Sequence, residues 1–320
     1  MNALSRPLNT ELYKKLHRFH NSRAADSLML SSEEYHALCQ FYGLPSNTSV
    51  RASVDYLACG SFHIAMHQFK PKMVTATVLI CHGYFDHAGL YGHLIDFLVK
   101  KNVQVFCFDM PGHGLSSGAK VEIKQFSDYQ AILKRALHYI EACSVNMSAL
   151  YGIGQSTGGA ILIDGLSSQL NTINLKGVAL LAPLVRPKAW QQARVMQSML
   201  AGKLAYWPRK FSRNSSDEKF LEFLKSTDPL QSRYLSVNWV GALNKWIPDI
   251  ESRPMRSQRV LVIQGAEDDT VDWQHNLPVI QGLFGTVKTC VIAEAGHQLV
   301  NEADALRTQV FQILAQELGL

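Results

Sequence analysis

Short hydrophobic, β-branched runs alternate with helix-like segments over most of this chain, and no other feature restricts the fold as strongly. Most of the six runs lack the polar alternation of a half-exposed strand, which indicates strands buried on both faces. This strand–helix–strand order predicts an α/β fold with a mostly parallel, doubly wound sheet. The runs are 76–81, 103–108, 149–153, 177–181, 259–263 and 288–292, and the helical segments are 91–100, 126–143, 158–169, 273–283 and 303–318.

One interval breaks the alternation. About seventy residues lie between Pro183 and Arg256, with helical patterning and no convincing buried strand, whereas a usual crossover needs about a dozen. We therefore expect a subdomain inserted between two strands of the sheet. Before the first parallel strand, 53–58 and 62–69 alternate with period two around Cys59-Gly60-Ser61 and predict an antiparallel hairpin.

The first fifty residues are expected to form a helical extension. Ser31 and Glu34 have the spacing of a capping box, and Gly43 and Pro45 end the helix that follows. The predicted division of the chain is a helical extension at 1–50, an α/β body at 51–183 and 256–320, and a helical cap at 184–255.

The composition is that of an ordinary globular protein. Of the 320 residues, 47% are hydrophobic and 18% are charged, which is enough to build a large core. A net charge of +5 with no long basic run argues against nucleic-acid binding. The six cysteines have neither CxxC nor zinc-type spacing, which is typical of buried thiols in a reducing compartment. With no apolar signal core or run of about 20 apolar residues, a cytoplasmic protein is expected, and peripheral membrane contact stays open.

The segment Gly154-Gln155-Ser156-Thr157-Gly158-Gly159 follows a predicted strand and leads into a predicted helix. A serine on such a turn needs a strained backbone, and Gly154 and Gly158 let neighbouring segments approach it. A phosphate-binding loop is the alternative, but no Gly-Lys-Ser/Thr follows and no GxGxxG pattern is present. The context therefore predicts Ser156 as a nucleophile on a strand-to-helix elbow.

A serine hydroxyl needs a base to take its proton and an acid to orient that base. In this fold class the acid follows a late strand and the histidine follows the last one. His297 is the only histidine after the last predicted strand, and Glu267-Asp268-Asp269 follows the strand before it. We take Asp268 as the acid, with Asp269 as second choice and Asp272 as the N-cap of the next helix.

The oxyanion of an acyl-transfer intermediate needs two backbone N–H donors. Thr157, directly after the nucleophile, is expected to supply one. The loop after the first parallel strand begins with His82-Gly83-Tyr84, and the N–H of Tyr84 is the expected second donor. His82 and His87 would also suit a metal, but no third ligand is spaced to join them, so neither metal nor cofactor is expected.

With these motifs in this order, the sequence resembles the α/β-hydrolase branch that holds monoacylglycerol lipases, bacterial lysophospholipases and serine aminopeptidase-like proteins. The resemblance runs from about Val54 to Leu318. Four segments carry it: 82–91 is similar to the family's HGxxEHxxxY oxyanion loop, 109–118 to its DxxGHGxSxG segment, 154–159 to its elbow, and 265–268 with Gly296-His297 to its acid and base motifs. The acid motif also places the family's catalytic aspartate on Asp268.

The chain departs from this family at the rim of the site. Asp86 stands where the family usually has Glu, and Leu90 where it has Arg. The elbow carries Gln155 and Thr157 where the family commonly reads G-H-S-M-G. None of these changes removes a catalytic atom, but they alter the surroundings of the substrate.

The resemblance implies a serine hydrolase that cleaves carboxylic esters through an acyl-enzyme, acting on a monoacylglycerol or a lysophospholipid. An aminopeptidase, a small-ester esterase or a thioesterase would use the same triad, and an aminopeptidase would need acidic side chains near the pocket to hold an amine. A non-catalytic binding protein on the same fold is a further alternative, although such proteins usually lose a triad member. Hydrolases with an aspartate nucleophile are disfavoured because position 156 is serine.

The predicted cap carries an apolar stripe with basic and aromatic flanks. The stripe is Trp190, Ala193, Met196, Met199, Leu200 and Leu204, and its flanks are Arg194, Lys203, Tyr206-Trp207, Arg209 and Lys210. Such a stripe could rest on an anionic membrane surface and admit a lipid. A helix that packs its stripe on the body is the simpler interpretation, because any amphipathic helix has one.

Overall fold

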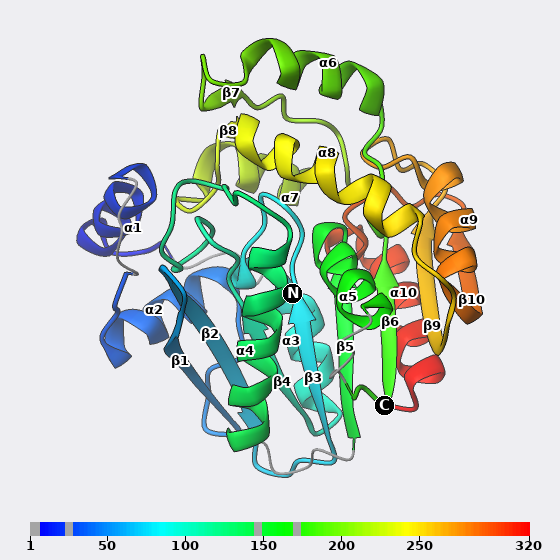
Figure 1. Ribbon diagram of the computed structural model, residues 1–320. Helices are drawn as coiled ribbons and strands as arrows, with labels where there is room; N and C mark the ends of the chain where they lie inside the picture. The colour runs from blue at the N-terminus through cyan, green and yellow to red at the C-terminus, as the bar shows by residue number, and fades with distance from the viewer. Residues whose placement is uncertain (1–6, 23–27, 144–148, 169–173) are drawn as a thin grey trace.

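A single mostly parallel sheet organises the computed structural model, which describes residues 7–22, 28–143, 149–168 and 174–320 (Figure 1). Its eight strands run in the order β1-β2-β4-β3-β5-β6-β9-β10. β2 pairs antiparallel with β1 and β4, and every later pair is parallel. The strands are β1 (Val50–Cys59), β2 (Phe62–Pro71), β3 (Ala76–Cys81), β4 (Val103–Phe108), β5 (Leu150–Gln155), β6 (Gly177–Leu181), β9 (Arg256–Gly265) and β10 (Phe284–Ile292). The predicted fold class, the hairpin and the six apolar strands are confirmed.

Helices cover both faces of this sheet, as Figure 1 shows. α4 (Ser127–Cys143), α5 (Thr157–Ser167) and α9 (Trp273–Leu283) pack on one face, and α3 (Gly92–Lys100) and α10 (Asp304–Leu318) pack on the other. Every residue of β3, β4 and β5 is buried, which explains why these strands show no polar alternation. The predicted end of the helix after the elbow, Gln169, lies outside the described residues.

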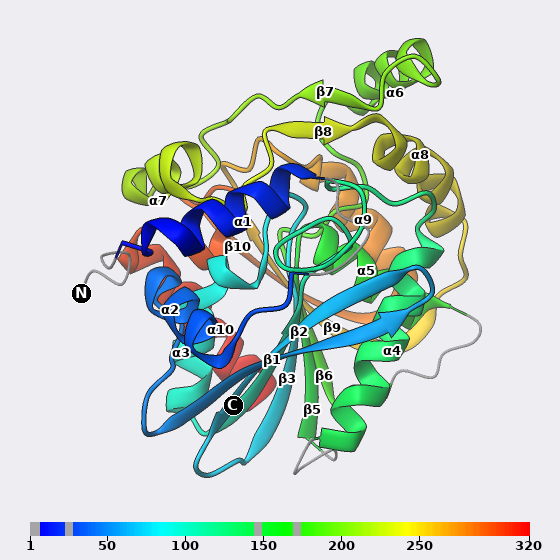
Figure 2. The same cartoon turned by 90° about the vertical axis from the view of Figure 1, so that its left-hand side faces the viewer.

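The N-terminal helices pack against the body near the antiparallel hairpin (Figure 2). They are α1 (Thr10–Ser22) and α2 (Ser32–Tyr42), and α2 begins with the predicted capping box between Ser31 and Glu34. Leu16 of α1 and Leu38 of α2 belong to the same buried cluster as the strands and helices of one sheet face. The core therefore continues from the described part of the extension into the body, while residues 1–6 and 23–27 lie outside the described residues.

A long segment between β6 and β9 lies over the carboxyl ends of the parallel strands (Figure 1). We call residues 184–255 the cap segment. It holds α6 (Trp190–Leu200), β7 (Tyr206–Pro208), α7 (Glu218–Glu222), the short helical turn η3 (Phe223–Thr227), β8 (Tyr234–Ser236) and α8 (Val237–Glu251). β7 and β8 form a small antiparallel ladder that the sequence did not predict, because strands of three residues carry too few positions for a period-two pattern.

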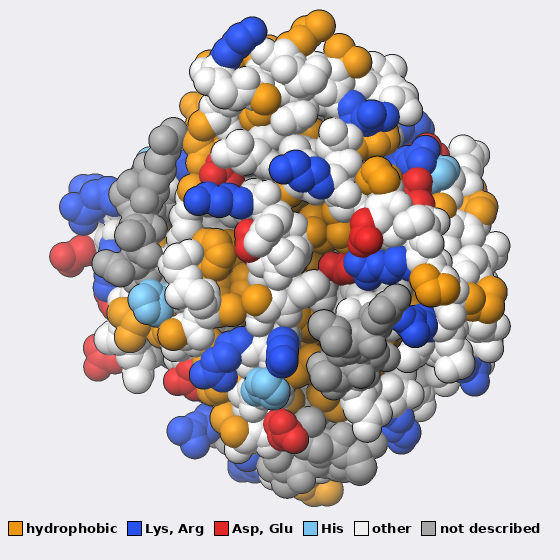
Figure 3. All heavy atoms as spheres, viewed as in Figure 1, with side chains coloured by type: hydrophobic (Ala, Val, Ile, Leu, Met, Phe, Trp, Pro, Cys, Tyr) orange, Lys and Arg blue, Asp and Glu red, His pale blue; other side chains and the backbone are white. Residues whose placement is uncertain are grey.

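The apolar stripe of the cap segment is only partly covered. Trp190 is buried and Ala193 packs against the core, whereas Met199 is 63% exposed and Leu204 49% exposed. Figure 3 shows hydrophobic and basic side chains together over this end of the molecule. Packing on the body therefore accounts for part of the stripe and leaves Met199 and Leu204 in solvent. Across the described residues, the helices are too short or too polar to span a bilayer.

Candidate active site

The predicted site residues converge at the carboxyl ends of four parallel strands of the sheet, β3, β5, β9 and β10. β3 has β4 on one side and β5 on the other, so the order of the strands reverses there, and open α/β sheets bind ligands at such a point. The loop after β5 begins with Ser156, and the loops after β9 and β10 carry Asp268 and His297. Sequence positions more than a hundred residues apart thus meet at one edge of the sheet.

Ser156 occupies a strained elbow between β5 and α5. Its φ is +53° and its ψ is −113°, a conformation that non-glycine residues rarely adopt. A Cβ on Gly154 would lie 2.5 Å from the carbonyl oxygen of Gly158, and one on Gly158 would lie 1.8 Å from that of Cys81. The two elbow glycines are therefore required by close backbone contacts, as predicted, and the serine N–H is held by the Leu181 carbonyl at 2.8 Å.

Asp268 and His297 form a buried pair. His297 Nδ1 lies 2.8 Å from Asp268 Oδ2, and the same carboxylate accepts hydrogen bonds from Gln264 Nε2 at 3.0 Å and from the N–H groups of Thr270 and Val271 at 2.8 and 3.1 Å. Burial alone would raise the pKa of Asp268, but the neighbouring His297 and these hydrogen bonds outweigh it, so the pKa is lowered. Asp268 is thus held as a carboxylate that fixes the proton of the imidazole on Nδ1 and leaves Nε2 as the basic nitrogen.

The other acidic candidates near Asp268 have different surroundings. Glu267 and Asp269 are exposed, and Asp269 forms an ion pair with Lys188. Asp272 stands at the N-cap position of α9, as predicted, although its side chain makes no capping hydrogen bond. Its backbone carbonyl receives the first helical N–H groups instead, from His275 and Asn276.

The loop from His82 to Tyr91, the oxyanion loop, is braced from within. The N–H of Gly83 donates to the Tyr91 hydroxyl at 3.0 Å, and that hydroxyl donates to Asp86 Oδ2 at 3.0 Å. Among the hydrogen bonds formed by the described residues, none uses the N–H of Tyr84 or of Thr157. These two donors, predicted to form the oxyanion hole, line the same cavity as Ser156.

His82 and His87 serve the structure of this loop. His82 Nδ1 bonds to the Gly83 carbonyl at 2.8 Å and His82 Nε2 accepts the N–H of Met110 at 2.9 Å. His87 Nδ1 accepts the N–H of Gly89, so its proton is on Nε2, which donates to Asp228 Oδ2 at 3.0 Å. All four ring nitrogens therefore have protein partners.

Several residues that hold His297 in place were not singled out as functional by the sequence. Gln155 Nε2 donates to the His297 carbonyl at 2.7 Å, and the Asn214 carbonyl accepts the His297 N–H at 3.1 Å. Gln298 Nε2 donates to Asp86 at 3.0 Å and ties the histidine loop to the oxyanion loop. Gln155 had a signal, since it departs from the family pattern. Asn214 had none, because it lies in the cap segment, far from the motifs.

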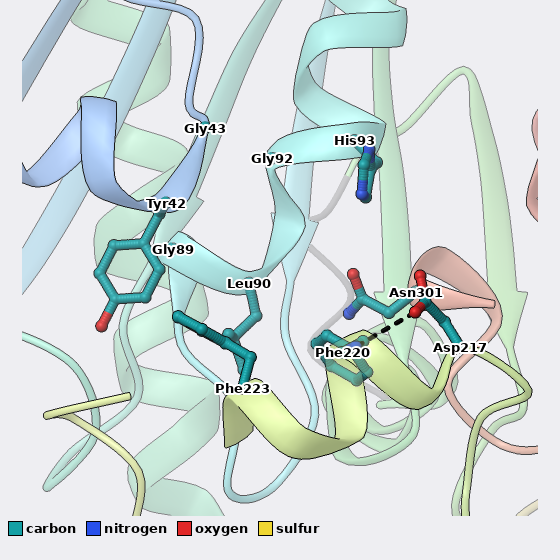
Figure 4. A pocket seen from close by; sticks show the side chains of 10 residues that line it. All are labelled: Tyr42, Gly43, Gly89, Leu90, Gly92, His93, Asp217, Phe220, Phe223 and Asn301. Atoms are coloured by element: carbon teal, nitrogen blue, oxygen red, sulfur yellow. Dashed lines mark hydrogen bonds between the residues drawn. The ribbon is translucent and has the colours of Figure 1, made fainter. Parts of the chain in front are cut away.

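A buried junction joins the N-terminal extension, the oxyanion loop and the cap segment. Asp228 of the cap segment accepts hydrogen bonds from the Tyr42 hydroxyl at 2.7 Å and from His87 at 3.0 Å. A small cavity of about 40 Å³ lies against Tyr42, and Phe220 and Phe223 of the cap segment also line it (Figure 4). The extension therefore reaches the site: Tyr42 bonds to Asp228, and Asp228 bonds to His87 of the oxyanion loop.

The cavity that contains Ser156 and His297 has a volume of about 260 Å³. Apolar side chains of the body and cap segment line much of it, namely Leu184, Trp190, Ala193, Leu235, Trp239, Val240, Leu243 and Val271. Lys188, Arg209 and Lys210 supply three cations, and no acidic side chain is among the described residues that line it. This space suits an apolar chain with a neutral or anionic polar end.

Comparisons with known proteins identify a family and several relatives of this chain. The family model described as serine aminopeptidase, S33, matches residues 72–304. The chain is 26% identical over 274 residues to the monoglyceride lipase of Homo sapiens, covering 82% of this chain and 86% of that protein. It is 24% identical over 215 residues to phospholipase YtpA of Bacillus subtilis, covering 65% of this chain and 81% of that protein.

A solved structure shares the fold. The crystal structure of a soluble variant of the Saccharomyces cerevisiae monoglyceride lipase, in complex with a substrate analog, superimposes with a TM-score of 0.73 at 18% identity, covering 86% of this chain and 97% of that one. The sheet order, the strained elbow and the family match over most of the chain agree with one another. The chain therefore belongs to the serine aminopeptidase, S33, family of α/β hydrolases, within which it is similar to monoacylglycerol lipases.

Proposed function

We propose that this protein is a serine hydrolase that cleaves the carboxylic ester of a monoacyl lipid through an acyl-enzyme. Ser156 attacks the ester carbonyl while His297 Nε2 takes the hydroxyl proton, and Asp268 orients the imidazole and stabilises its charged form. The N–H groups of Tyr84 and Thr157 hold the oxyanion. His297 then gives its proton to the departing alcohol.

Water completes the cycle in this proposal. His297 removes a proton from a water molecule that attacks the acyl-Ser156 carbonyl, and the second tetrahedral intermediate uses the same two N–H donors. Its collapse returns the proton to Ser156 and releases a fatty acid. Tyr91 and Asp86 act as positioning residues, because they hold Gly83 and so the turn that presents Tyr84.

The side chains that line the cavity favour a lipid ester over a peptide as the substrate. An aminopeptidase holds a free amine with acidic side chains, and the described lining of this cavity contains cations and no acid. Its apolar wall suits an acyl chain. The relatives named as monoglyceride lipase and phospholipase support the same choice over a peptide substrate.

We further propose that the cap segment touches a lipid surface during catalysis. Val195, Met199, Leu204 and Trp207 are exposed hydrophobic side chains of this segment, and Arg194 and Lys203 directly precede Val195 and Leu204 in sequence. Apolar side chains flanked by cations bind anionic interfaces. This would place the cavity near its substrate without a membrane-spanning helix.

The variant Ser156→Ala tests the reaction. Hydrolysis of p-nitrophenyl esters should fall by about 10⁶-fold, to the background rate, because the nucleophile is removed while binding groups remain. Circular dichroism should show an unchanged fold. Ser198→Ala is the matched control, since Ser198 lies exposed on α6. Full activity of the Ser156 variant would exclude the proposed nucleophile.

A panel of esters of graded chain length, assayed with and without detergent micelles, tests the substrate class. Long-chain monoacylglycerol and lysophosphatidylcholine should be hydrolysed faster than two- to four-carbon esters, because only a long chain fills the apolar wall. A preference for short soluble esters would instead favour a small-ester esterase with the same triad.

A further inference from the structure

Arg209 stands out among the cations of the catalytic cavity because of what surrounds it. The residue follows β7 of the cap segment and lines the cavity together with Ser156 and His297. Its guanidinium carbon lies 3.9 Å from the ring centre of Phe85 in the oxyanion loop and 4.5 Å from that of Phe211. Two aromatic rings thus hold the side chain in one place.

The guanidinium has neutral hydrogen-bond partners. Arg209 Nη1 donates to Gln231 Oε1 and to the Ser232 carbonyl. No carboxylate of the described residues lies within ion-pair distance of it, whereas the half-buried Arg186 and Arg253 both pair with carboxylates. Arg209 is therefore a half-buried cation with no counter-ion in the part of the chain that the structure describes.

The two carboxylates whose charge acts most on Arg209, Asp86 and Asp228, are already engaged elsewhere. Asp86 accepts from Tyr91 and Gln298, and Asp228 accepts from Tyr42 and His87. Burial lowers the pKa of Arg209 to about 10, which keeps it charged at neutral pH. A cation that has lost water and gained no counter-ion favours an anion in the space beside it.

The position of Arg209 indicates which part of a substrate it would meet. The chain that leaves Arg209 continues to Ser212 and Asn214, which also line the cavity, and the Asn214 carbonyl bonds the His297 N–H. His297 gives its proton to the leaving alcohol in the proposed reaction, so this polar side faces the alcohol rather than the acyl chain. The acyl chain is left with the apolar side chains of α8.

We propose that Arg209 binds the phosphate of the substrate's alcohol part, so that the preferred substrate is a lysophospholipid rather than a neutral monoacylglycerol. The inference rests on the proposed esterase function. A guanidinium fork matches the oxygens of a phosphate, and Lys210 on the same wall adds charge. The acyl ester is hydrolysed to a fatty acid and a glycerophosphodiester, and the phosphate bonds are left intact.

Kinetics on two lipids with the same acyl chain test this. For 1-oleoyl-lysophosphatidylglycerol and 1-oleoylglycerol in neutral detergent micelles, the wild type should show the higher kcat/KM on the phospholipid. Arg209→Gln should lower the ratio of the two values by about 10- to 100-fold, as expected for a lost charge-assisted hydrogen bond. Arg209→Lys, which keeps the charge and loses the fork, should lower it less.

The control variant is Lys245→Gln, which removes one exposed cation of α8 in the cap segment without altering the described lining of the cavity. Its ratio should equal that of the wild type. An unchanged ratio in Arg209→Gln, or a wild type that prefers 1-oleoylglycerol, would overturn the proposal.

A binding measurement separates this inference from the proposed function. Ser156→Ala should bind 1-oleoyl-lysophosphatidylglycerol at least 10-fold more tightly than 1-oleoylglycerol by calorimetry, and Ser156→Ala/Arg209→Gln should lose that preference. If the wild type hydrolyses neither lipid but this preference is found, the esterase function fails and the phosphate site stands. If hydrolysis occurs and the preference is absent, the site fails and the function stands.

Discussion

At the scale of single residues, burial and hydrogen-bond partners distinguish Asp268 from the two acidic residues beside it. Glu267 and Asp269 point into solvent, whereas Asp268 is buried and receives hydrogen bonds from Gln264 and from two backbone N–H groups besides its contact with His297. These donors hold it ionised in a place where burial opposes ionisation. Its role in the proposed reaction is to orient a base.

The substitution Asp268→Asn should lower kcat on p-nitrophenyl butyrate by about 10³- to 10⁴-fold, with a small change in KM, because an amide no longer favours the Nδ1–H form of His297. Asp269→Asn is the control, since that side chain pairs with Lys188 at the surface, and it should stay within about twofold of the wild type. Equal losses in the two variants would show that Asp268 is not the orienting acid.

Residues on local motifs could be predicted, and residues that act through distant contacts could not. Ser156 and His297, which line one cavity, could be proposed as site residues because the strand before each of them is visible in the sequence. Asn214 reaches His297 only through the folded path of the cap segment, over a loop with no periodic pattern. Asp272 occupies the predicted N-cap position without a side-chain capping hydrogen bond, because a favourable N-cap residue type does not determine where its side chain turns.

At the scale of elements, the junction around Asp228 fixes three pieces of the chain to one another. Tyr42 ends α2, His87 belongs to the oxyanion loop, and Asp228 follows η3 of the cap segment. Burial would raise the pKa of Asp228, but His87, Tyr42 and the N–H of Leu230 outweigh it and lower the pKa. The cap segment is therefore anchored at its base beside the site, even though α6 stands partly exposed.

Because Asp228 is ionised and buried at this junction, the free energy of unfolding should depend on its protonation. A carboxyl whose pKa is lowered in the folded state stabilises the fold above its ordinary pKa near 3.8, and this stabilisation is lost as the pH falls through the lowered value. Asp228→Asn should therefore reduce the free energy of unfolding by about 3–5 kcal/mol at pH 6. It should also make that free energy fall less steeply between pH 5 and pH 3.

Urea unfolding at a series of pH values measures both effects. Asp304→Asn is the matched control, because Asp304 is an exposed carboxylate at the start of α10. It should change the free energy of unfolding by less than about 0.5 kcal/mol at every pH. A pH dependence of Asp228→Asn that equals that of the wild type would contradict the assigned role of the junction.

At the scale of the whole molecule, we propose the division into an extension at 1–50, a body at 51–183 and 256–320, and a cap at 184–255, with all three sharing their cores. Leu38 of the extension, Phe220 of the cap segment and Val310 of α10 belong to one buried cluster. The alternation of strands made the body predictable. The contacts of the extension were not predictable, because the sequence does not show which surface an amphipathic helix covers.

Shared cores predict a single cooperative unfolding transition. Four of the five tryptophans, Trp190, Trp207, Trp239 and Trp246, lie in the cap segment, so their fluorescence reports mainly on that segment, while far-ultraviolet circular dichroism reports on all helices. The two urea curves should have the same midpoint. A fluorescence transition at lower urea would show that the cap segment unfolds as an independent unit.

The central claim is that Ser156 is the nucleophile of a working triad, and covalent labelling tests it most directly. Wild-type protein treated with a fluorophosphonate probe should gain the mass of one adduct, and peptide mapping should place it on Ser156. Ser156→Ala should gain none, and Asp268→Asn should be labelled far more slowly, because its histidine is wrongly oriented. Failure of the wild type to react, or an adduct on another residue, would contradict the account.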